Sequence, residues 1–249
     1  MSGAASPAWA IATQTGVELR LTARRGENLL AMVGIPAAIL LLFGTTAILP
    51  APASGSRVDA ILPGTLSLAI IATGLVNLGI ATAYERGYGV LKRLGGSPLG
   101  RSGIIAAKIL TILVIEFVLL AVLVGLAAGV LGWRPPGAID WPVLVAGVIL
   151  GTATFAGFGL ALAGGIRPEA TLVLANVLFL VALAIGGVLV PVDGLPSTVA
   201  TIAAFLPPAL LTDVLRIGLG TPGDPIALLA LGAWGLFAVV LAIRAFHWD

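Results

Sequence analysis

The chain has 249 residues, of which 59% are apolar and only 10% are charged, and its formal net charge is +2. A typical soluble domain is about 45–50% apolar and about 25% charged, so this composition indicates a membrane protein. One span of the bilayer takes about 20 apolar residues, and six spans would leave too little chain for an ATPase or another catalytic domain. The small net charge gives no indication of a nucleic-acid partner.

Cysteine is absent and the one histidine is His247, which excludes disulfides, thiolate metal sites and buried histidine clusters. The sequence also lacks a Gly-rich phosphate loop that ends in Lys-Ser or Lys-Thr, so we do not expect this chain to hydrolyse ATP by that route. We predict no catalytic residue, no metal site and no cofactor bound by the chain itself.

Residues 1–28 form the predicted cytoplasmic N-terminal segment. Within it, residues 16–28 are weakly amphipathic, with Val17 and Leu21 on one side and arginines on another. A helix of this kind lies in the membrane interface, with its arginines extended to the headgroups. The alternative is a solvated basic tail. The first fifteen residues lack the basic and apolar regions of a signal peptide, so we expect the first apolar segment to be retained.

Five intervals without charged residues, and a sixth interrupted only by Glu116, are long enough to cross a bilayer. An ionised group at the bilayer centre costs about 2.5–3.5 kcal/mol on insertion scales, so these intervals locate the spans. We predict an all-α polytopic membrane protein with one six-span domain over residues 29–246. The predicted spans are 29–49, 62–83, 104–131, 142–163, 171–190 and 226–245.

The basic residues predict the orientation, because Lys and Arg accumulate in cytoplasmic loops. With the N-terminus inside, ten basic residues lie on the inner side and three on the outer side. Both termini are therefore predicted to be cytoplasmic. The inner residues are Arg20, Arg24, Arg25, Arg86, Lys92, Arg93, Arg101, Lys108, Arg167 and Arg244; the outer ones are Arg57, Arg134 and Arg216.

Residues 193–221 are apolar, but prolines divide them into pieces of ten and eleven residues at 197–206 and 209–219. Helices of that length reach only about 15 to 17 Å, half of the hydrocarbon core. We predict a re-entrant helical hairpin that enters from the outer side. The alternative is a pair of amphipathic helices lying flat on the outer surface, with Thr212, Asp213 and Arg216 facing water.

Residues 84–99 read YERGYGVLKRLGGSPL and lie between the second and third predicted spans on the cytoplasmic side. Tyr84, Tyr88 and Leu91 recur at the spacing of one helical face, which predicts a short amphipathic helix with an apolar ridge and charges around it. Two glycines inside the segment oppose a helix by about 1 kcal/mol each. A ridge of this kind can insert into a groove on a soluble partner. The alternative is an ordinary basic inner loop.

This segment resembles the cytoplasmic coupling helix of the ABC type-2 export permeases, in which Glu-Arg, a Gly, a Leu-Lys-Arg-Leu stretch and Ser-Pro follow one another. The matching residues are Glu85, Arg86, Gly89, Leu91, Lys92, Arg93, Leu94, Ser97, Pro98 and Leu99. Gly87 and Val90 depart from the pattern. Further matches, in the order of the family, are Pro63-Gly64, Gly187 with Pro191, Leu195-Pro196, Pro207-Pro208 and Leu215-Arg216.

The resemblance implies a six-helix permease half that pairs with a second permease subunit, identical or different. Each half would bind a separately encoded nucleotide-binding ATPase, which holds ATP and Mg, and closure of the ATPases would rock the helices and expel a lipophilic substrate. The residues expected to bind the ATPase are Tyr84, Glu85, Arg86, Tyr88, Gly89, Leu91, Lys92, Arg93, Leu94, Ser97 and Pro98.

Glu116 is the only charged residue well inside a predicted span, and Asn77 and Asn176 are the other strongly polar residues there. We predict that these three residues belong to the substrate path. Glu116 lies about 18 Å along its helix from Ile104, near mid-depth. A lone carboxylate gives weak support for an ion-coupled secondary transporter, and it equally fits a protonated carboxyl hydrogen-bonded at a helix interface. The ion-coupled carrier and a non-transporting immunity or scaffold protein stay open as alternatives.

Arginine outnumbers lysine eleven to two in a chain rich in Ala, Gly and Val, which is typical of a GC-rich bacterial coding sequence. We therefore predict a multi-pass protein of the bacterial plasma membrane. The short outer loops favour a compact hydrophobic cargo, such as a drug or a lipid, over a bulky polymer.

Overall fold

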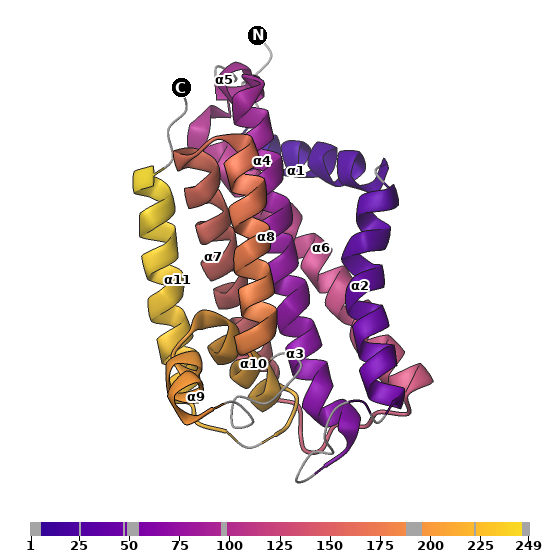
Figure 1. Ribbon diagram of the computed structural model, residues 1–249. Coiled ribbons are helices and arrows are strands. Elements are labelled where there is room, and N and C mark those ends of the chain that lie inside the picture. The colour runs from indigo at the N-terminus through magenta and orange to yellow at the C-terminus, as the bar shows by residue number, and fades with distance from the viewer. Residues whose placement is uncertain are drawn as a thin grey trace.

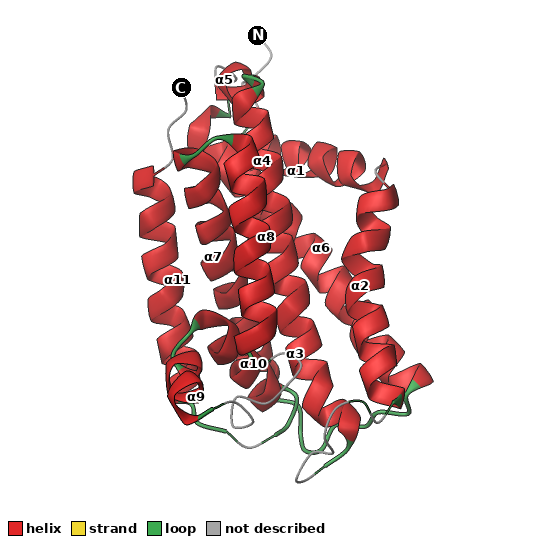
Figure 2. Cartoon of the chain, viewed as in Figure 1, coloured by secondary structure: helices red, strands yellow, loops and turns green. Residues whose placement is uncertain are grey.

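The computed structural model describes residues 6–24, 26–46, 48, 55–95, 99–187, 196–221 and 223–245. Every regular element in these ranges is a helix (Figures 1 and 2), which confirms the predicted all-α class. The helices are α1 (Pro7–Arg24), α2 (Gly26–Thr45), α3 (Arg57–Ile71), the π-helix η1 (Ala72–Leu78), α4 (Gly79–Gly87), α5 (Val90–Gly95), α6 (Gly100–Val130), α7 (Trp141–Gly165), α8 (Pro168–Ile185), α9 (Ser197–Ala204), α10 (Pro207–Gly218) and α11 (Ile226–Ala245).

Four helical segments in the described residues are long and apolar enough to cross a membrane. They are Arg57–Gly87, which joins α3, η1 and α4, and Ser102–Val130, Trp141–Gly165 and Ile226–Ala245. The bent pair α9–α10 would make a fifth. Helices α2 and α8 run alongside these segments (Figure 1), but their described apolar parts, Met32–Thr45 and Pro168–Ala184, are shorter. The count of six spans therefore stays a prediction.

Helix α1 begins and ends earlier than predicted. The expected helix at 16–28 is wrong in its bounds, because α1 runs from Pro7 to Arg24 and α2 starts directly afterwards. Ser6 explains the early start, since its hydroxyl accepts a hydrogen bond of 3.3 Å from the backbone N–H of Trp9 and a proline follows it, both common at a helix N-terminus. Helix α1 lies across one end of the bundle and packs against α6 (Figure 1).

Helix α7 is the centre of the bundle and packs against α11, α10, α4 and η1. Its glycines permit these close contacts. A Cβ atom at Gly157 would lie 2.8 Å from the backbone carbon of Ala238 in α11, and one at Gly151 would lie 2.8 Å from Cδ1 of Leu211 in α10. Close packing of small residues joins helices in lipid, where the hydrophobic effect between them is lost.

The π-helix η1 meets α7 backbone to backbone. A Cβ atom at Gly159 would lie 2.6 Å from the carbonyl oxygen of Gly74 and 3.0 Å from that of Leu75. A Cβ atom at Gly79 would lie 3.0 Å from Cα of Gly159. These glycines let the α3–η1–α4 segment rest directly on α7.

The two half-length helices differ in their environment. In α10, Leu211, Val214 and Leu215 are fully buried against α3, α7 and α11, whereas Ile202 of α9 and Phe205 are exposed. The helices are bent by 73° with respect to each other. In α10 the expectation that Thr212 faces water is wrong, because Thr212 is buried and donates to the carbonyl oxygen of Pro208 at 3.0 Å. Asp213 and Arg216 form a partly exposed ion pair at 2.8 Å. Entry of the hairpin into a membrane stays a prediction.

The glycine contact between α7 and η1 gives a prediction about stability. Gly159→Ala forces two backbones apart and should lower the free energy of unfolding by about 1–3 kcal/mol. Gly129→Ala is the matched control, because a Cβ atom at Gly129 meets no atom within 4 Å. Thermal unfolding of both variants in detergent measures the difference. Equal melting temperatures for both variants and the parent would contradict this packing.

Candidate functional site

The segment that resembles a coupling helix is two helices and not one. Helix α4 ends at Gly87, Tyr88 and Gly89 form a turn, and α5 begins at Val90. Gly89 has a φ of +71°, a conformation that glycine adopts at little cost, and its N–H donates to the carbonyl oxygen of Arg86 at 2.9 Å. The predicted continuous helix is therefore wrong. Ser97, Pro98 and the side chain of Leu94, which belong to the predicted site, lie outside the described residues.

This break separates the three residues of the predicted apolar ridge. Tyr84 is half-buried, Tyr88 is 75% exposed and Leu91 is 1% exposed. The rings of Tyr84 and Tyr88 lie 6.0 Å apart. Leu91 faces its own chain, in a helix that packs against α4 and α6, so a single exposed ridge of all three residues is wrong.

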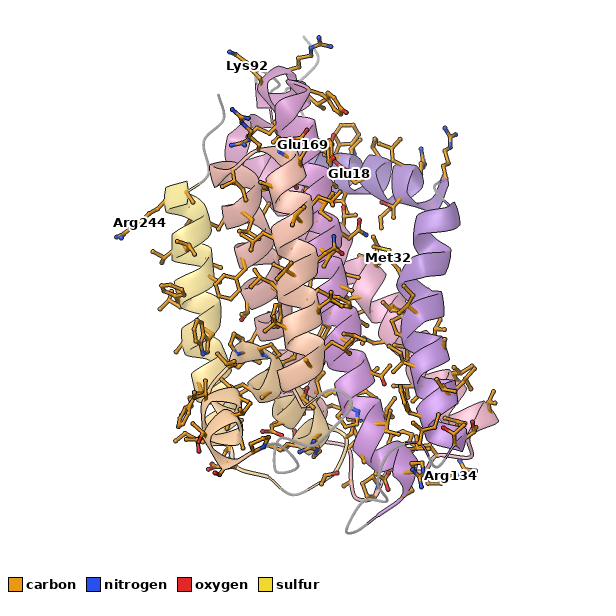
Figure 3. The ribbon with its side chains drawn as sticks, in the orientation of Figure 1. Glu18, Met32, Lys92, Arg134, Glu169 and Arg244 are labelled. Carbon is orange, nitrogen blue, oxygen red and sulfur yellow. The ribbon has the colours of Figure 1, made fainter. Side chains whose placement is uncertain are left out.

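The exposed part of this region is the tip formed by Tyr88, Val90, Lys92 and Arg93, hereafter the α5 tip. It projects beyond the bundle at the end where α1 lies, and Lys92 points away from the other helices (Figure 3). The α5 tip combines two apolar side chains with two basic ones.

Glu85 is directed toward the interior of its own chain. Its Oε2 atom lies 2.7 Å from Nζ of Lys108 in α6. Lys108 is only 5% exposed, and its Nζ atom also lies 3.6 Å from Oε1 of Glu18 in α1. Glu85 therefore joins the end of α4 to α6, and through Lys108 to α1.

Arg86 faces the end of α7. Its guanidinium donates to the backbone carbonyl oxygens of Gly164 and Ile166, at the end of α7. The last carbonyl groups of a helix lack partners within the helix, and a cation suits the negative end of the helix dipole. Glu85 and Arg86 were expected to bind the partner, but they bind neighbouring helices of the same chain.

A groove of about 770 Å³ opens beside α4. Asn77 of η1 and Asn176 of α8 both line it, together with mostly apolar side chains from α1, α2 and α4 and with Tyr88 and Val90 of the α5 tip. The Asn77 amide donates to Sδ of Met32 at 3.3 Å, and the Asn176 amide donates to the carbonyl oxygen of Leu172 at 2.8 Å. Two of the three residues predicted for the substrate path thus face one groove.

Glu116, the third of these residues, does not line the groove. It is fully buried between α6, η1 and α7, where it accepts a hydrogen bond of 2.6 Å from the Thr73 hydroxyl and another from the Thr152 hydroxyl. This arrangement matches the alternative of a carboxyl hydrogen-bonded at a helix interface.

The model of the ABC-2 type transporter family matches residues 11–219, from α1 to α10. The chain belongs to the ABC-2 type transporter family. No curated protein matches the chain.

Membership of the ABC-2 family confirms the resemblance drawn from residues 84–99. It makes the chain a membrane-embedded permease component of an ABC transporter, a component that is generally not catalytic. An ABC transporter contains an ATP-binding component, so the family implies a partner of that kind.

The Glu116 hydrogen bonds give a prediction about packing. Glu116→Gln retains one acceptor and gains one donor, so both threonines keep a partner, and the melting temperature should stay near that of the parent. Glu116→Ala leaves a cavity and should cost about 2 kcal/mol or more. Exposed Glu169 of α8 provides the control, because Glu169→Ala should change stability by about 0.5 kcal/mol at most. A Gln variant as unstable as the Ala variant would contradict this role.

Proposed function

We propose that this chain is the membrane-spanning permease subunit of an ABC exporter of the bacterial plasma membrane. A separate ATPase subunit binds the α5 tip and supplies the energy of ATP hydrolysis, with its own ATP and Mg. The cargo is a lipophilic small molecule or a lipid. The observation that carries the proposal is the position of the α5 tip, which projects from the membrane bundle in a chain of the ABC-2 family.

The exposed chemistry of the α5 tip supports docking to a soluble protein. Tyr88 is 75% exposed and Val90 is 39% exposed, and both lie beside exposed Lys92 and Arg93. A partner groove would bury the apolar side chains, while the charges orient the complex at its rim. Leu91 contributes indirectly, because its burial holds α5 in place.

The connections of α4 support transmission from the α5 tip to the membrane helices. Helix α4 continues through η1 into α3 as one candidate span of 31 residues. Glu85 and Arg86 join its end to α6 and α7. A displacement of α5 would therefore move several helices together. One of them, η1, contains Asn77, which lines the groove.

The composition of the groove supports a lipophilic cargo. Apolar side chains such as Ile35, Val76 and Phe179 line most of it, and Asn77 and Asn176 add two polar amides. Binding sites for small ligands are mostly apolar, with a few polar groups that fix orientation. We propose that the substrate path follows this groove, and that Glu116 supports the helix contact behind it.

The proposed assembly has six spans per subunit, cytoplasmic termini and a second permease subunit, identical or different. Helix α1 and the end of α11 lie at the same end of the bundle as α5, and Arg134 lies at the opposite end (Figures 1 and 3). This placement agrees with the excess of basic residues proposed for the cytoplasmic side. Large apolar side chains such as Val173 and Leu180 are exposed on α8, where they contact lipid or the second subunit.

The orientation can be tested because the chain contains no cysteine. Ala138 lies between α6 and α7, and Ala170 lies in the first turn of α8; both are exposed. In intact cells, an impermeant thiol reagent should label Ala138→Cys and leave Ala170→Cys unlabelled until the membrane is opened. The reverse labelling pattern would overturn the orientation and place the α5 tip outside the cell.

The docking proposal predicts that Tyr88 is the main anchor. Removal of a buried aromatic anchor costs about 2 kcal/mol or more, or about thirtyfold in Kd. Tyr88→Ala should therefore weaken binding of the ATPase strongly, and Lys92→Ala should weaken it less, since a rim charge contributes mainly to the association rate. Copurification of the ATPase with tagged variants, followed by titration of the purified subunits, measures both effects.

Phe205 supplies a matched control for Tyr88. It is 71% exposed and follows α9, which lies at the opposite end of the bundle (Figure 1). Phe205→Ala removes a similar exposed aromatic group and should leave ATPase binding unchanged. Equal affinity for the ATPase in the parent and in Tyr88→Ala would remove the α5 tip as the docking site.

The alternative of an ion-coupled carrier rests on Glu116 and receives no support from its position. The carboxyl group is fully buried, accepts hydrogen bonds from two threonines and does not line the groove. ATP-dependent export should therefore persist in Glu116→Gln. Transport driven by a proton gradient alone in the parent, and lost in the Gln variant, would favour the ion-coupled carrier.

A further inference from the structure

A buried lysine joins three helices at the end of the bundle that carries the α5 tip. Lys108 lies about 12 Å along α6 from Gly100 and is 5% exposed. Its Nζ atom lies 2.7 Å from Oε2 of Glu85 in α4 and 3.6 Å from Oε1 of Glu18 in α1. The Gln14 amide donates to the same Glu18 oxygen at 3.1 Å.

Burial makes the position of Lys108 dependent on both carboxylates. A buried ammonium group is costly unless charged partners compensate for the lost water, and Glu18 and Glu85 supply those partners from two different helices. Helix α1 also approaches α6 beside this site: the Thr15 hydroxyl donates to the carbonyl oxygen of Ile11 at 2.9 Å and lies 3.4 Å from the carbonyl oxygen of Ala107. Lys108 therefore fixes α1 and α4 with respect to α6.

These two helices lead to different walls of the groove. Helix α4 continues into η1, which carries Asn77, and Glu85 lies three residues before Tyr88 of the α5 tip. Helix α1 leads directly into α2, whose Met32 and Ile35 line the groove. Through Lys108, a displacement of α5 can be transmitted to both the η1 wall and the α2 wall of the groove.

We propose that Lys108 is a positioning residue that makes α1 and α4 move together when the partner ATPase displaces α5. The groove walls formed by α2 and by η1 then respond as one unit. This inference rests on the proposed function, because it requires an ATPase at the α5 tip. Without the Lys108 ammonium group, α4 would move while α1 and α2 keep their positions.

The test follows the α2 wall with a cysteine, which the natural sequence lacks. Ile35 is 55% exposed and lines the groove. The complex carries Ile35→Cys and is reconstituted with the ATPase that copurifies with the tagged parent chain. The rate of labelling by N-ethylmaleimide is measured without nucleotide and after trapping with ATP and vanadate.

Four variants are compared in the Ile35→Cys background. ATP with vanadate should change the labelling rate by about threefold or more in the unmodified background and in Lys108→Arg, which keeps the cation. In Lys108→Met the nucleotide-dependent change should disappear, although the ATPase still binds and hydrolyses ATP. Glu18→Gln should reduce the change as well, and it serves as the milder variant if Lys108→Met does not fold. Glu169→Gln, an exposed carboxylate at the same end (Figure 3), should leave it intact.

Hydrogen exchange of the permease alone provides a second measurement. Amides of residues 7–24 should exchange faster in Lys108→Met than in the parent, and at the parental rate in Lys108→Arg. An unchanged labelling response in Lys108→Met, or an equal loss in Lys108→Arg and Lys108→Met, would overturn the role of the lysine. The role of the lysine would also be overturned if the parent complex hydrolysed ATP but the labelling rate of Ile35→Cys did not change. The proposed function would then stand. Failure of any ATPase to copurify with the parent overturns both.

Discussion

The attachment of α4 to its neighbours through two adjacent residues is the constraint on which the functional geometry depends. Glu85 pairs with Lys108 on one side, and Arg86 binds the last carbonyls of α7 on the other. Consecutive residues of a helix point about 100° apart, so a Glu-Arg pair can reach two different partners. With both contacts in place, the short helix α5 extends from a fixed support, and a force on α5 acts on the whole bundle.

The same arrangement connects the α5 tip to the groove through α4 and η1. The α3–η1–α4 segment rests on α7 through Gly74, Gly79 and Gly159, without side chains between the backbones. On the side of this contact that is farther from the α5 tip, Glu116 of α6 joins η1 to α7 through Thr73 and Thr152. Helix α7 therefore provides a rigid surface, and η1 is held on it at two levels. π-helical turns occur often at functional sites, and here η1 carries Asn77 into the groove.

The sequence predicts the parts of the structure that depend on composition and local order. Apolar intervals locate the long helices, and the prolines between 191 and 208 predict the short pair α9 and α10. Local signals can also mislead: the spacing of Tyr84, Tyr88 and Leu91 indicates one helical face, but Gly89 ends the helix between them with its positive φ. For α1, the cap at Ser6 determines the start more than the apolar pattern after residue 16 does.

The contacts that position the α5 tip and the groove lie beyond prediction from a single sequence, because their partners are far apart in the chain. Lys108 lies 90 positions after Glu18, and in the sequence it counts only as one more cation of the predicted cytoplasmic side. No sequence pattern marks the carbonyl groups that Arg86 binds, since every residue has a backbone carbonyl group. Thr73 and Thr152 are weakly polar side chains inside apolar spans, and only the fold brings them to Glu116.

Cross-linking from the α5 tip in native membranes is the most direct test of the central claim that this tip docks an ATPase. A photoreactive amino acid is placed at position 88, which is exposed, or at position 91, which is buried three residues later. We expect a cross-link between position 88 and a nucleotide-binding ATPase, and no such product from position 91. A cross-link to an ATPase from position 91 alone, or from neither position, would contradict the claim.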